Sequence, residues 1–121
     1  SVGSSSECHC SSVGKCLLAF GRDVDLSVYE AHPLSVYTEY TISTVEKLKE
    51  ELQDVREKGY AIDREELELG LTCIGAPILD RSGHAIAAIS LSGPKSRMLA
   101  GDFCERVRAV TEAARKISAN F

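Results

Sequence analysis

The stretch YAIDREELELGLTCIGAPILD, from Tyr60 to Asp80, decides the fold. From Leu69 onward its pattern has a period of two, so alternate side chains point to opposite faces of a strand. One face carries Leu71, Cys73, Gly75 and Pro77, and the other carries Thr72, Ile74, Ala76 and Ile78. The next four residues, Asp80-Arg81-Ser82-Gly83, are typical of a turn. A return strand from His84 to Ser92 then predicts a β-hairpin.

Two polar groups in this stretch need an explanation. Asp63 lies in the acid-rich segment that leads into the strand, and the thiol of Cys73 lies among aliphatic residues in its middle. A strand buried on both faces needs neither group. A strand that forms the floor of a pocket uses both, because ligand sites combine an apolar lining with a few polar groups.

The length of the hairpin loop decides which residues face one another. A four-residue loop gives three cross-strand pairs: Leu79 with His84, Cys73 with Ser90, and Leu71 with Ser92. A three-residue loop instead places Cys73 opposite Leu91. The first register gathers a thiol and two hydroxyls on one apolar face close to Asp63. In the alternative interpretation the two serines simply face solvent, which is common in half-buried sheets.

Helices are expected on both sides of the hairpin in the sequence. The first has the apolar stripe Val13, Cys16, Leu17 and Phe20, with Ser11 or Ser12 as its N-cap. A short one is expected over Leu26–Ala31, ended by Pro33. The third has the stripe Val45, Leu48, Leu52 and Val55, a capping box of Ser43 and Glu46, and Gly59 as its stop. The last is capped by Asp102 and follows Phe103, Val107, Val110, Ala114, Ile117 and Phe121.

This order of elements predicts an α+β fold in which helices pack on an antiparallel sheet. A single hairpin is too small a sheet to be stable. Further strands must therefore come from the early residues, from a partner chain, or from sequence outside this chain.

The helix that begins near Ser12 is a candidate anion site. Its free N–H groups and dipole favour negative charge, and Gly14 in the first turn permits a close approach. The simpler interpretation is a serine cap with Gly14 selected for tight packing.

Composition restricts the class of protein. The chain has 121 residues, 44% hydrophobic and 26% charged, which suits one globular domain. Its net charge of −4 and the absence of a basic cluster make it a poor candidate for binding phosphate backbones itself. The sequence has no apolar run of the ~20 residues that a membrane span needs and no signal-peptide pattern, so no membrane contact is expected. The odd count of 5 cysteines indicates reduced thiols in a cytoplasmic protein. No cofactor is expected.

The sequence resembles the IclR family of transcriptional regulators. The resemblance lies in VGSSSECHCSSVGKCLLAF (Val2–Phe20), in TEYTI (Thr38–Ile42) and in the long segment Leu48–Arg97. Within that segment, the pattern R-x-x-G-Y-x-x-D-x-E-E-x-x-x-G-x-x-C-x-x-A-P is the specific signature. The resemblance implies a regulator with an N-terminal winged helix-turn-helix domain and a GAF-like sensor domain. Residues 1–121 would then be the C-terminal portion of the sensor domain, without the DNA-binding domain and without the first helix and strands of the sensor.

The resemblance also implies a site, a ligand and an assembly. The effector of this family is a small organic acid, and the regulators form homodimers or homotetramers that reach DNA through the N-terminal domain. The implied effector-binding residues in this sequence are Ser12, Val13, Asp63, Leu71, Cys73, Ser90 and Ser92. The helix at Ser12 would hold the carboxylate, Ser90 and Ser92 would complete its coordination, and Leu71 and Cys73 would form the floor.

Two alternatives remain open from the sequence. In the first, a GAF-like redox enzyme uses Cys73 as a nucleophile, activated by Asp63 or a histidine. In the second, Asp63 and Cys73 bind zinc together with His9 or Cys10. The motif Cys8-His9-Cys10 alone is not expected to bind a metal, because alternate side chains of an extended segment point apart.

Overall fold

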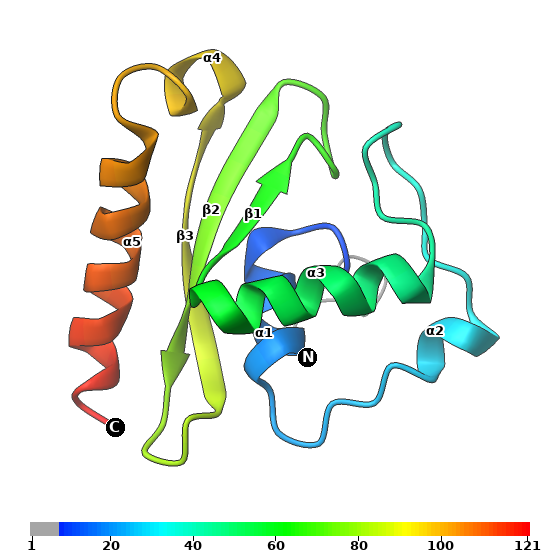
Figure 1. Cartoon of the computed structure of the whole chain (residues 1–121), viewed down its shortest axis with the longest axis horizontal. Helices are drawn as coiled ribbons and strands as arrows, with labels where there is room; N and C mark the ends of the chain where they lie inside the picture. Colours follow the sequence, from blue (N-terminus) through cyan, green and yellow to red (C-terminus); the bar gives the residue numbers. More distant parts are fainter. Residues whose placement is uncertain (1–7) are drawn as a thin grey trace.

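The computed structural model describes residues 8–121, which form a three-stranded antiparallel sheet covered by helices on both faces. The elements along the chain are α1 (Ser12–Phe20), α2 (Val28–Ala31), α3 (Val45–Lys58), β1 (Ala61–Arg64), β2 (Leu71–Leu79), β3 (Ala85–Pro94), α4 (Lys95–Met98) and α5 (Phe103–Ser118). Figure 1 shows α5 on one side of the sheet and α1 with α3 on the other. The predicted α+β architecture is therefore confirmed.

The third strand comes from a segment that the sequence did not indicate. β1 covers only four residues and pairs antiparallel with β2, with Ala61 opposite Gly75 and Asp63 opposite Cys73. The sequence here is an acid-rich segment without strand periodicity, because Asp63 and Arg64 interrupt the apolar pattern. The sheet order β1-β2-β3 puts the long hairpin strand β2 in the centre. Its residues 72–78 are all buried, as expected of a strand covered on both faces.

The hairpin register differs from the predicted one by two residues. Ser92, not Ser90, lies opposite Cys73, and Ser90 lies opposite Gly75. Leu71 pairs with Pro94 instead of Ser92, and Leu79 pairs with Ala85 instead of His84. One residue of the difference comes from the longer loop and the other from a β-bulge at Ile78/Leu79. Because a shift of two preserves the side-chain alternation, Cys73, Ser90 and Ser92 still share a face.

The helix ends are mostly as predicted. The Ser11 hydroxyl caps α1 by accepting from the Gly14 N–H at 3.0 Å, and Asp102 caps α5. Gly59 ends α3 in the left-handed conformation, with φ 86°. The predicted capping box at Ser43 is wrong by one residue, because the extended Thr44 is the N-cap and accepts from the Lys47 N–H. The second helix is shorter than predicted and begins at Val28.

The buried face of α1 also differs from the predicted stripe. The residues with the deepest burial are Ser12, Gly14, Lys15, Cys16 and Ala19, whereas Val13, Leu17 and Phe20 are only half-buried. The cause is the position of α1 between the sheet and α3, which covers the side of the helix that carries the lysine.

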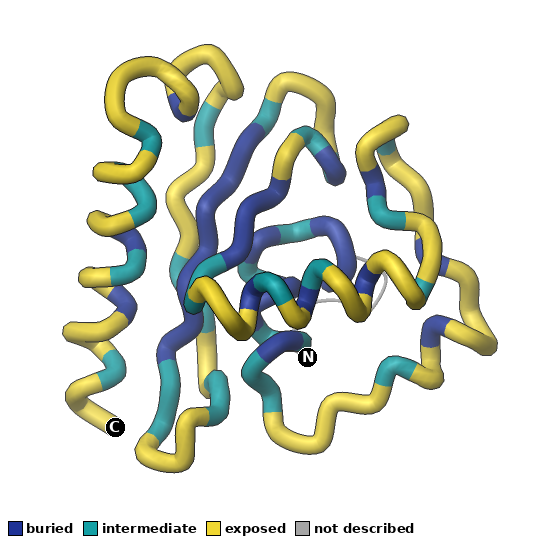
Figure 2. Tube along the Cα trace, in the orientation of Figure 1, coloured by how far each residue is buried: buried dark blue, intermediate teal, exposed yellow. Residues whose placement is uncertain are grey.

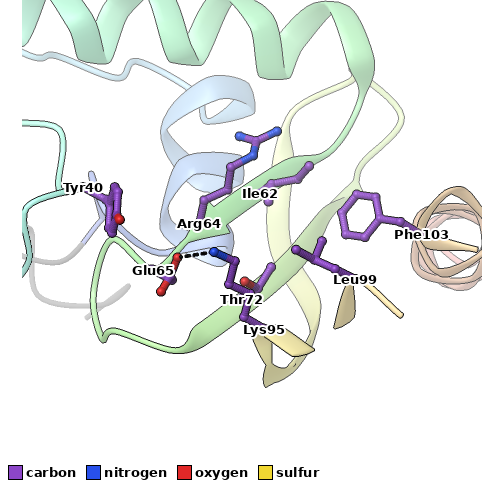
Figure 3. A pocket seen from close by; sticks show the side chains of 8 residues that line it. All are labelled: Tyr40, Ile62, Arg64, Glu65, Thr72, Lys95, Leu99 and Phe103. Atoms are coloured by element: carbon purple, nitrogen blue, oxygen red, sulfur yellow. Dashed lines mark ion pairs between the residues drawn. The ribbon is translucent and has the colours of Figure 1, made fainter. Parts of the chain in front are cut away.

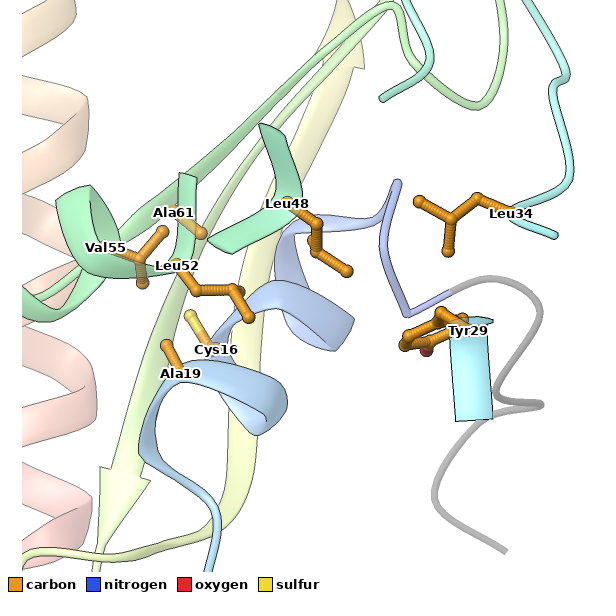
Figure 4. Packing of buried hydrophobic residues seen from close by; sticks show 8 residues of the cluster. All are labelled: Cys16, Ala19, Tyr29, Leu34, Leu48, Leu52, Val55 and Ala61. Atoms are coloured by element: carbon orange, nitrogen blue, oxygen red, sulfur yellow. The ribbon is translucent and has the colours of Figure 1, made fainter. Parts of the chain in front are cut away.

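Each face of the sheet has its own apolar core, and Figure 2 shows the burial concentrated between the layers. On the α1 side, Figure 4 shows a core in which α1 and α3 contribute most of the residues, with others from α2, the loop after it and β1: Cys16, Ala19, Tyr29, Leu34, Leu48, Leu52, Val55 and Ala61. On the α5 side the core contains Ile74, Ala76, Ile78, Met98, Val110 and Ala114. The two cores fix α1 and α5 on opposite faces of β2.

Candidate functional site

A row of three polar side chains crosses the sheet on the face that α1 covers. Asp63 on β1 lies opposite Cys73 on β2, and Cys73 lies opposite Ser92 on β3. The neighbouring row on the same face contains Ala61, Gly75 and Ser90. Directly opposite residues of antiparallel strands have Cβ atoms only about 4.5–5.5 Å apart. The backbone thus brings a carboxyl, a thiol and a hydroxyl together from three strands.

The first turn of α1 lies directly on this face at Gly75. A Cβ atom added at Gly75 would lie 2.9 Å from the carbonyl carbon, the Cβ and the oxygen of Ser12. Only glycine permits this approach, because real Cβ atoms do not come so close to backbone. Gly75 is the next residue after Cys73 on this face of β2, so the contact holds Ser12 and the adjacent Val13 close to Cys73.

The first turn of α1 has two N–H groups without a protein acceptor among residues 8–121. The Ser11 hydroxyl accepts from Gly14, and the Ser11 carbonyl accepts from the Lys15 N–H at 2.9 Å. Within the described residues, the N–H groups of Ser12 and Val13 have no such acceptor. Unpaired first-turn N–H groups and the helix dipole attract anions.

The predicted site residues differ in exposure. Ser12, Asp63 and Cys73 are buried, at 2%, 1% and 8% exposed, and Val13 and Leu71 are half-buried. Leu71 begins β2 on the Cys73 face, one alternation away from the row. Ser90 and Ser92 are exposed, because β3 is the outer strand of the described sheet. The two hydroxyls thus lie on the Cys73 face and are open to solvent or to a ligand.

A buried lysine next to this face was not singled out from the sequence. Lys15 is fully buried, and its Nζ donates to Glu51 Oε2 at 2.7 Å, Glu66 Oε2 at 2.8 Å and the Ile62 carbonyl at 2.9 Å. These bonds join α1, α3, β1 and the loop after β1. The sequence gives one signal that Lys15 is buried. The lysine lies in a helix between Gly14 and Cys16, and such small residues bring the helix backbone close to neighbouring elements.

Glu66 connects this lysine to Asp63. The Glu66 N–H donates to Asp63 Oδ1 at 2.8 Å, while Glu66 Oε2 also accepts from the Arg64 N–H at 3.1 Å. The other carboxyl oxygen, Glu66 Oε1, is buried without a partner among residues 8–121. Burial raises the pKa of both carboxyls, and the Lys15 charge and the hydrogen bonds oppose that rise. Lys15 and Glu66 therefore fix the position of Asp63.

The environment of Cys73 does not favour a nucleophile. Burial raises the pKa of its thiol, a hydrogen bond with Ser92 lowers it, and the charge of Asp63 raises it again. A catalytic cysteine needs the opposite, a nearby cation or base that stabilises the thiolate. His9 does not supply this, because burial lowers its pKa and its Nε2 is paired with the Ser35 carbonyl at 2.7 Å.

The predicted zinc ligands do not converge. Asp63, Cys73, His9 and Cys10 are all described, and no three His, Cys, Asp or Glu side chains within 8–121 form a group that could hold a metal ion.

None of the helices in the described range is both long and apolar enough to span a bilayer.

Comparison with known proteins identifies the family. Residues 1–119 match the family model described as Bacterial transcriptional regulator IclR C-terminal. The HTH-type transcriptional regulator BhcR of Paracoccus denitrificans is 42% identical over 117 residues, which are 96% of this chain and 42% of BhcR. The chain therefore belongs to the IclR family of bacterial transcriptional regulators and is an effector-binding domain of the C-terminal type. It spans less than half the length of that relative.

Solved structures agree with the fold. The crystal structure of the C-terminal domain of E. coli transcriptional regulator KdgR superimposes with a TM-score of 0.81 at 42% identity, covering 93% of this chain and 69% of that one. The inducer-binding domain of the PobR transcription factor from Acinetobacter, a double mutant in complex with 3-hydroxybenzoic acid, gives a TM-score of 0.79 at 30% identity, covering 92% and 65%.

Proposed function

We propose that this domain binds a small organic acid between the first turn of α1 and the row Asp63–Cys73–Ser92. The observation that carries the proposal is the register itself. It puts a carboxyl, a thiol and a hydroxyl side by side on the face that the first turn of α1 covers at Gly75. The PobR inducer-binding domain, which has a similar fold, was solved with an aromatic hydroxy acid, and this supports the ligand class.

Each side chain has a distinct part in this proposal. The N–H groups of Ser12 and Val13 receive the carboxylate, helped by the positive end of α1. Ser90 and Ser92 donate from the exposed strand β3, and Leu71 with Cys73 forms the apolar floor. Asp63 accepts from an effector hydroxyl, which selects acids with a hydroxyl or a hydrated carbonyl over plain alkyl acids.

The domain acts as a non-catalytic sensor in this proposal. Residues 1–121 form the C-terminal portion of one sensor domain in a cytoplasmic regulator that assembles as a dimer or tetramer. A separate N-terminal domain binds DNA. The effector changes DNA binding only if it prefers one state of the regulator, typically by about 1–3 kcal/mol.

A thermal-shift screen tests the ligand class. The chain is melted with lactate, pyruvate and 3-hydroxybenzoate, and at least one acid is expected to raise the melting temperature. An acid at a hundredfold excess over its Kd stabilises a fold by about 2.7 kcal/mol. The double variant Ser90→Ala/Ser92→Ala is expected to lose this shift, whereas Ser43→Ala, an exposed serine outside the site, keeps it. Stabilisation by the matching neutral amides alone would rule out the carboxylate site.

A further inference from the structure

A cavity of about 300 Å³ lies on the other face of the sheet, away from the row Asp63–Cys73–Ser92. Its floor contains Ile62 on β1 and Thr72 on β2, which alternate with Asp63 and Cys73 along the strands. Leu99 and Phe103, near the junction of α4 and α5, form an apolar wall (Figure 3). The rim carries Tyr40, Arg64, Glu65 and Lys95. This volume is at the lower end of the ~300–1,000 Å³ found for small-molecule sites.

Thr72 gives the floor of this cavity an unused polar group. The residue is 3% exposed, and its hydroxyl has no hydrogen-bond partner in the described part of the chain. The hydroxyl oxygen is not among the fully buried side-chain atoms that lack a partner, so it is accessible from the cavity. The hydroxyl lines an open cavity instead of contacting protein, so a ligand with an acceptor group can pair with it.

The charges at the rim favour an anion. Lys95 Nζ is neutralised by Glu65 Oε2 at 3.2 Å. The N–H of Gly70 and then Lys95 hold the pKa of Glu65 below its usual value, so this carboxyl stays ionised. Arg64 is exposed and has no ion-pair partner within 8–121. The rim therefore has a net positive charge, with more free donors than free acceptors.

The backbone at Glu65, on the rim of the cavity, has an unusual conformation. Glu65 has φ 58°, a left-handed conformation that is uncommon for a residue other than glycine. Its N–H donates to the Leu71 carbonyl at 3.0 Å, and its own carbonyl accepts from the Thr38 hydroxyl at 2.6 Å. Such conformations persist where the surroundings hold them, and they concentrate at functional sites. Here the conformation places the carboxylate across from Lys95 at the edge of the cavity (Figure 3).

We propose that this cavity is a second small-molecule site, for a small monocarboxylic acid with an apolar, ring-sized body. The apolar body contacts Ile62, Leu99 and Phe103, the carboxylate accepts from Thr72, and the charge of Arg64 at the rim attracts it. The site is separate from the proposed effector site, because β2 lies between them and no residue is shared.

NMR with benzoate as the probe tests this site on the 121-residue chain. In a ¹⁵N-labelled sample, benzoate is expected to give saturable shifts at the amides of Thr72, Leu99 and Phe103. Arg64→Gln is expected to weaken benzoate binding at these amides at least tenfold. Arg81→Gln, which removes an exposed arginine of the hairpin turn, is the matched control and is expected to leave the affinity unchanged.

Two further comparisons test the role of the Thr72 hydroxyl and the role of the negative charge on the ligand. Thr72→Val keeps the shape of the side chain but removes the hydroxyl, and it is expected to weaken benzoate binding several-fold. Thr72→Ser keeps the hydroxyl and is expected to keep benzoate binding. Benzyl alcohol, which lacks the charge, is expected to bind at least tenfold more weakly than benzoate. Ser90→Ala/Ser92→Ala is expected to leave these shifts intact, which separates this site from the proposed effector site. The proposal is overturned if benzoate does not shift these amides, if Arg81→Gln weakens binding as much as Arg64→Gln, or if benzyl alcohol binds equally well.

Discussion

Lys15 and Glu66 form a buried ion pair, with Nζ of the lysine 2.8 Å from Oε2 of the glutamate. Glu66 in turn donates its N–H to Asp63, which lies in the proposed effector site. The pair joins the helix that presents Ser12 and Val13 to the strand that presents Asp63. The relative position of the two halves of the site therefore depends on this pair.

Replacing the lysine is expected to destabilise the domain strongly. Lys15→Met leaves Glu66 buried without its cation, and breaking a buried pair in this way typically costs about 3–5 kcal/mol. Urea unfolding measures the loss, with the exposed Lys49→Met as the control, expected within about 0.5 kcal/mol of the unmodified chain. Adding Glu66→Gln to Lys15→Met is expected to recover part of the loss, since it removes an unpaired charge. A cost below about 1 kcal/mol for Lys15→Met would contradict this role.

The pH dependence of stability is expected to report on Asp63. Burial raises the pKa of this carboxyl above its unfolded value, so its stabilising contribution is complete below the unfolded pKa and is lost as pH rises through the folded pKa. Asp63→Asn keeps an acceptor for the Glu66 N–H but removes this loss. Its free energy of unfolding, relative to that of the unmodified chain, is therefore expected to rise as the pH increases above about 4.

The same urea titrations, repeated at each pH, measure this difference. The exposed Asp23→Asn serves as the control, and its difference from the unmodified chain is expected to stay constant. A difference for Asp63→Asn that falls with rising pH would show that the folded protein favours the ionised carboxylate instead.

Replacing Gly75 is expected to disturb the contact between α1 and β2 in the proposed site. A methyl group there meets the backbone of Ser12 at 2.9 Å, so α1 must move away from β2. Gly75→Ala is expected to cost about 1–3 kcal/mol, in the range of other overpacked cores, and to weaken acid binding. Gly93→Ala on β3 is the matched control, because its methyl group meets only the flexible side chain of Met98, at 3.3 Å. Equal costs for the two variants would argue against a tight contact at Ser12.

Thiol reactivity separates a sensor from a cysteine-dependent enzyme. Cys104 is exposed. Burial raises the pKa of the Cys73 thiol, and burial raises the pKa of the Cys16 thiol to about 12. Iodoacetamide at neutral pH is therefore expected to alkylate Cys104 at least about tenfold faster than Cys73, as followed by peptide mass spectrometry. Cys104→Ser is expected to abolish the fast phase. Rapid alkylation of Cys73 would instead favour the enzymatic alternative.

Local patterns in the sequence predicted most of the fold. The caps at Ser11 and Asp102, the stop at Gly59 and the hairpin depend on neighbouring residues, and the structure confirms them. β1 was missed because four residues with two charges give no clear alternation. The charge at Asp63 is tolerated in the sheet because the Glu66 N–H pairs with it, and this is a tertiary effect.

The hairpin register and the burial of Lys15 could not be predicted from neighbouring residues in the sequence. The bulge at Ile78/Leu79 leaves no mark in the sequence, and only the preserved alternation kept Cys73, Ser90 and Ser92 on one face. Lys15 is buried because Glu51 and Glu66, which follow it by 36 and 51 positions, provide its counter-charges. Their convergence depends on the packing of α1 against α3 and β1.

A crystal structure with a bound acid tests the central claim most directly. The chain is crystallised with whichever of lactate, pyruvate and 3-hydroxybenzoate raises its melting temperature most. The carboxylate is expected within hydrogen-bonding distance of the Ser12 and Val13 N–H groups and of the Ser92 hydroxyl, with Cys73 beneath it. An acid bound elsewhere, with the face between α1 and Cys73 closed to it, would contradict the proposed effector site.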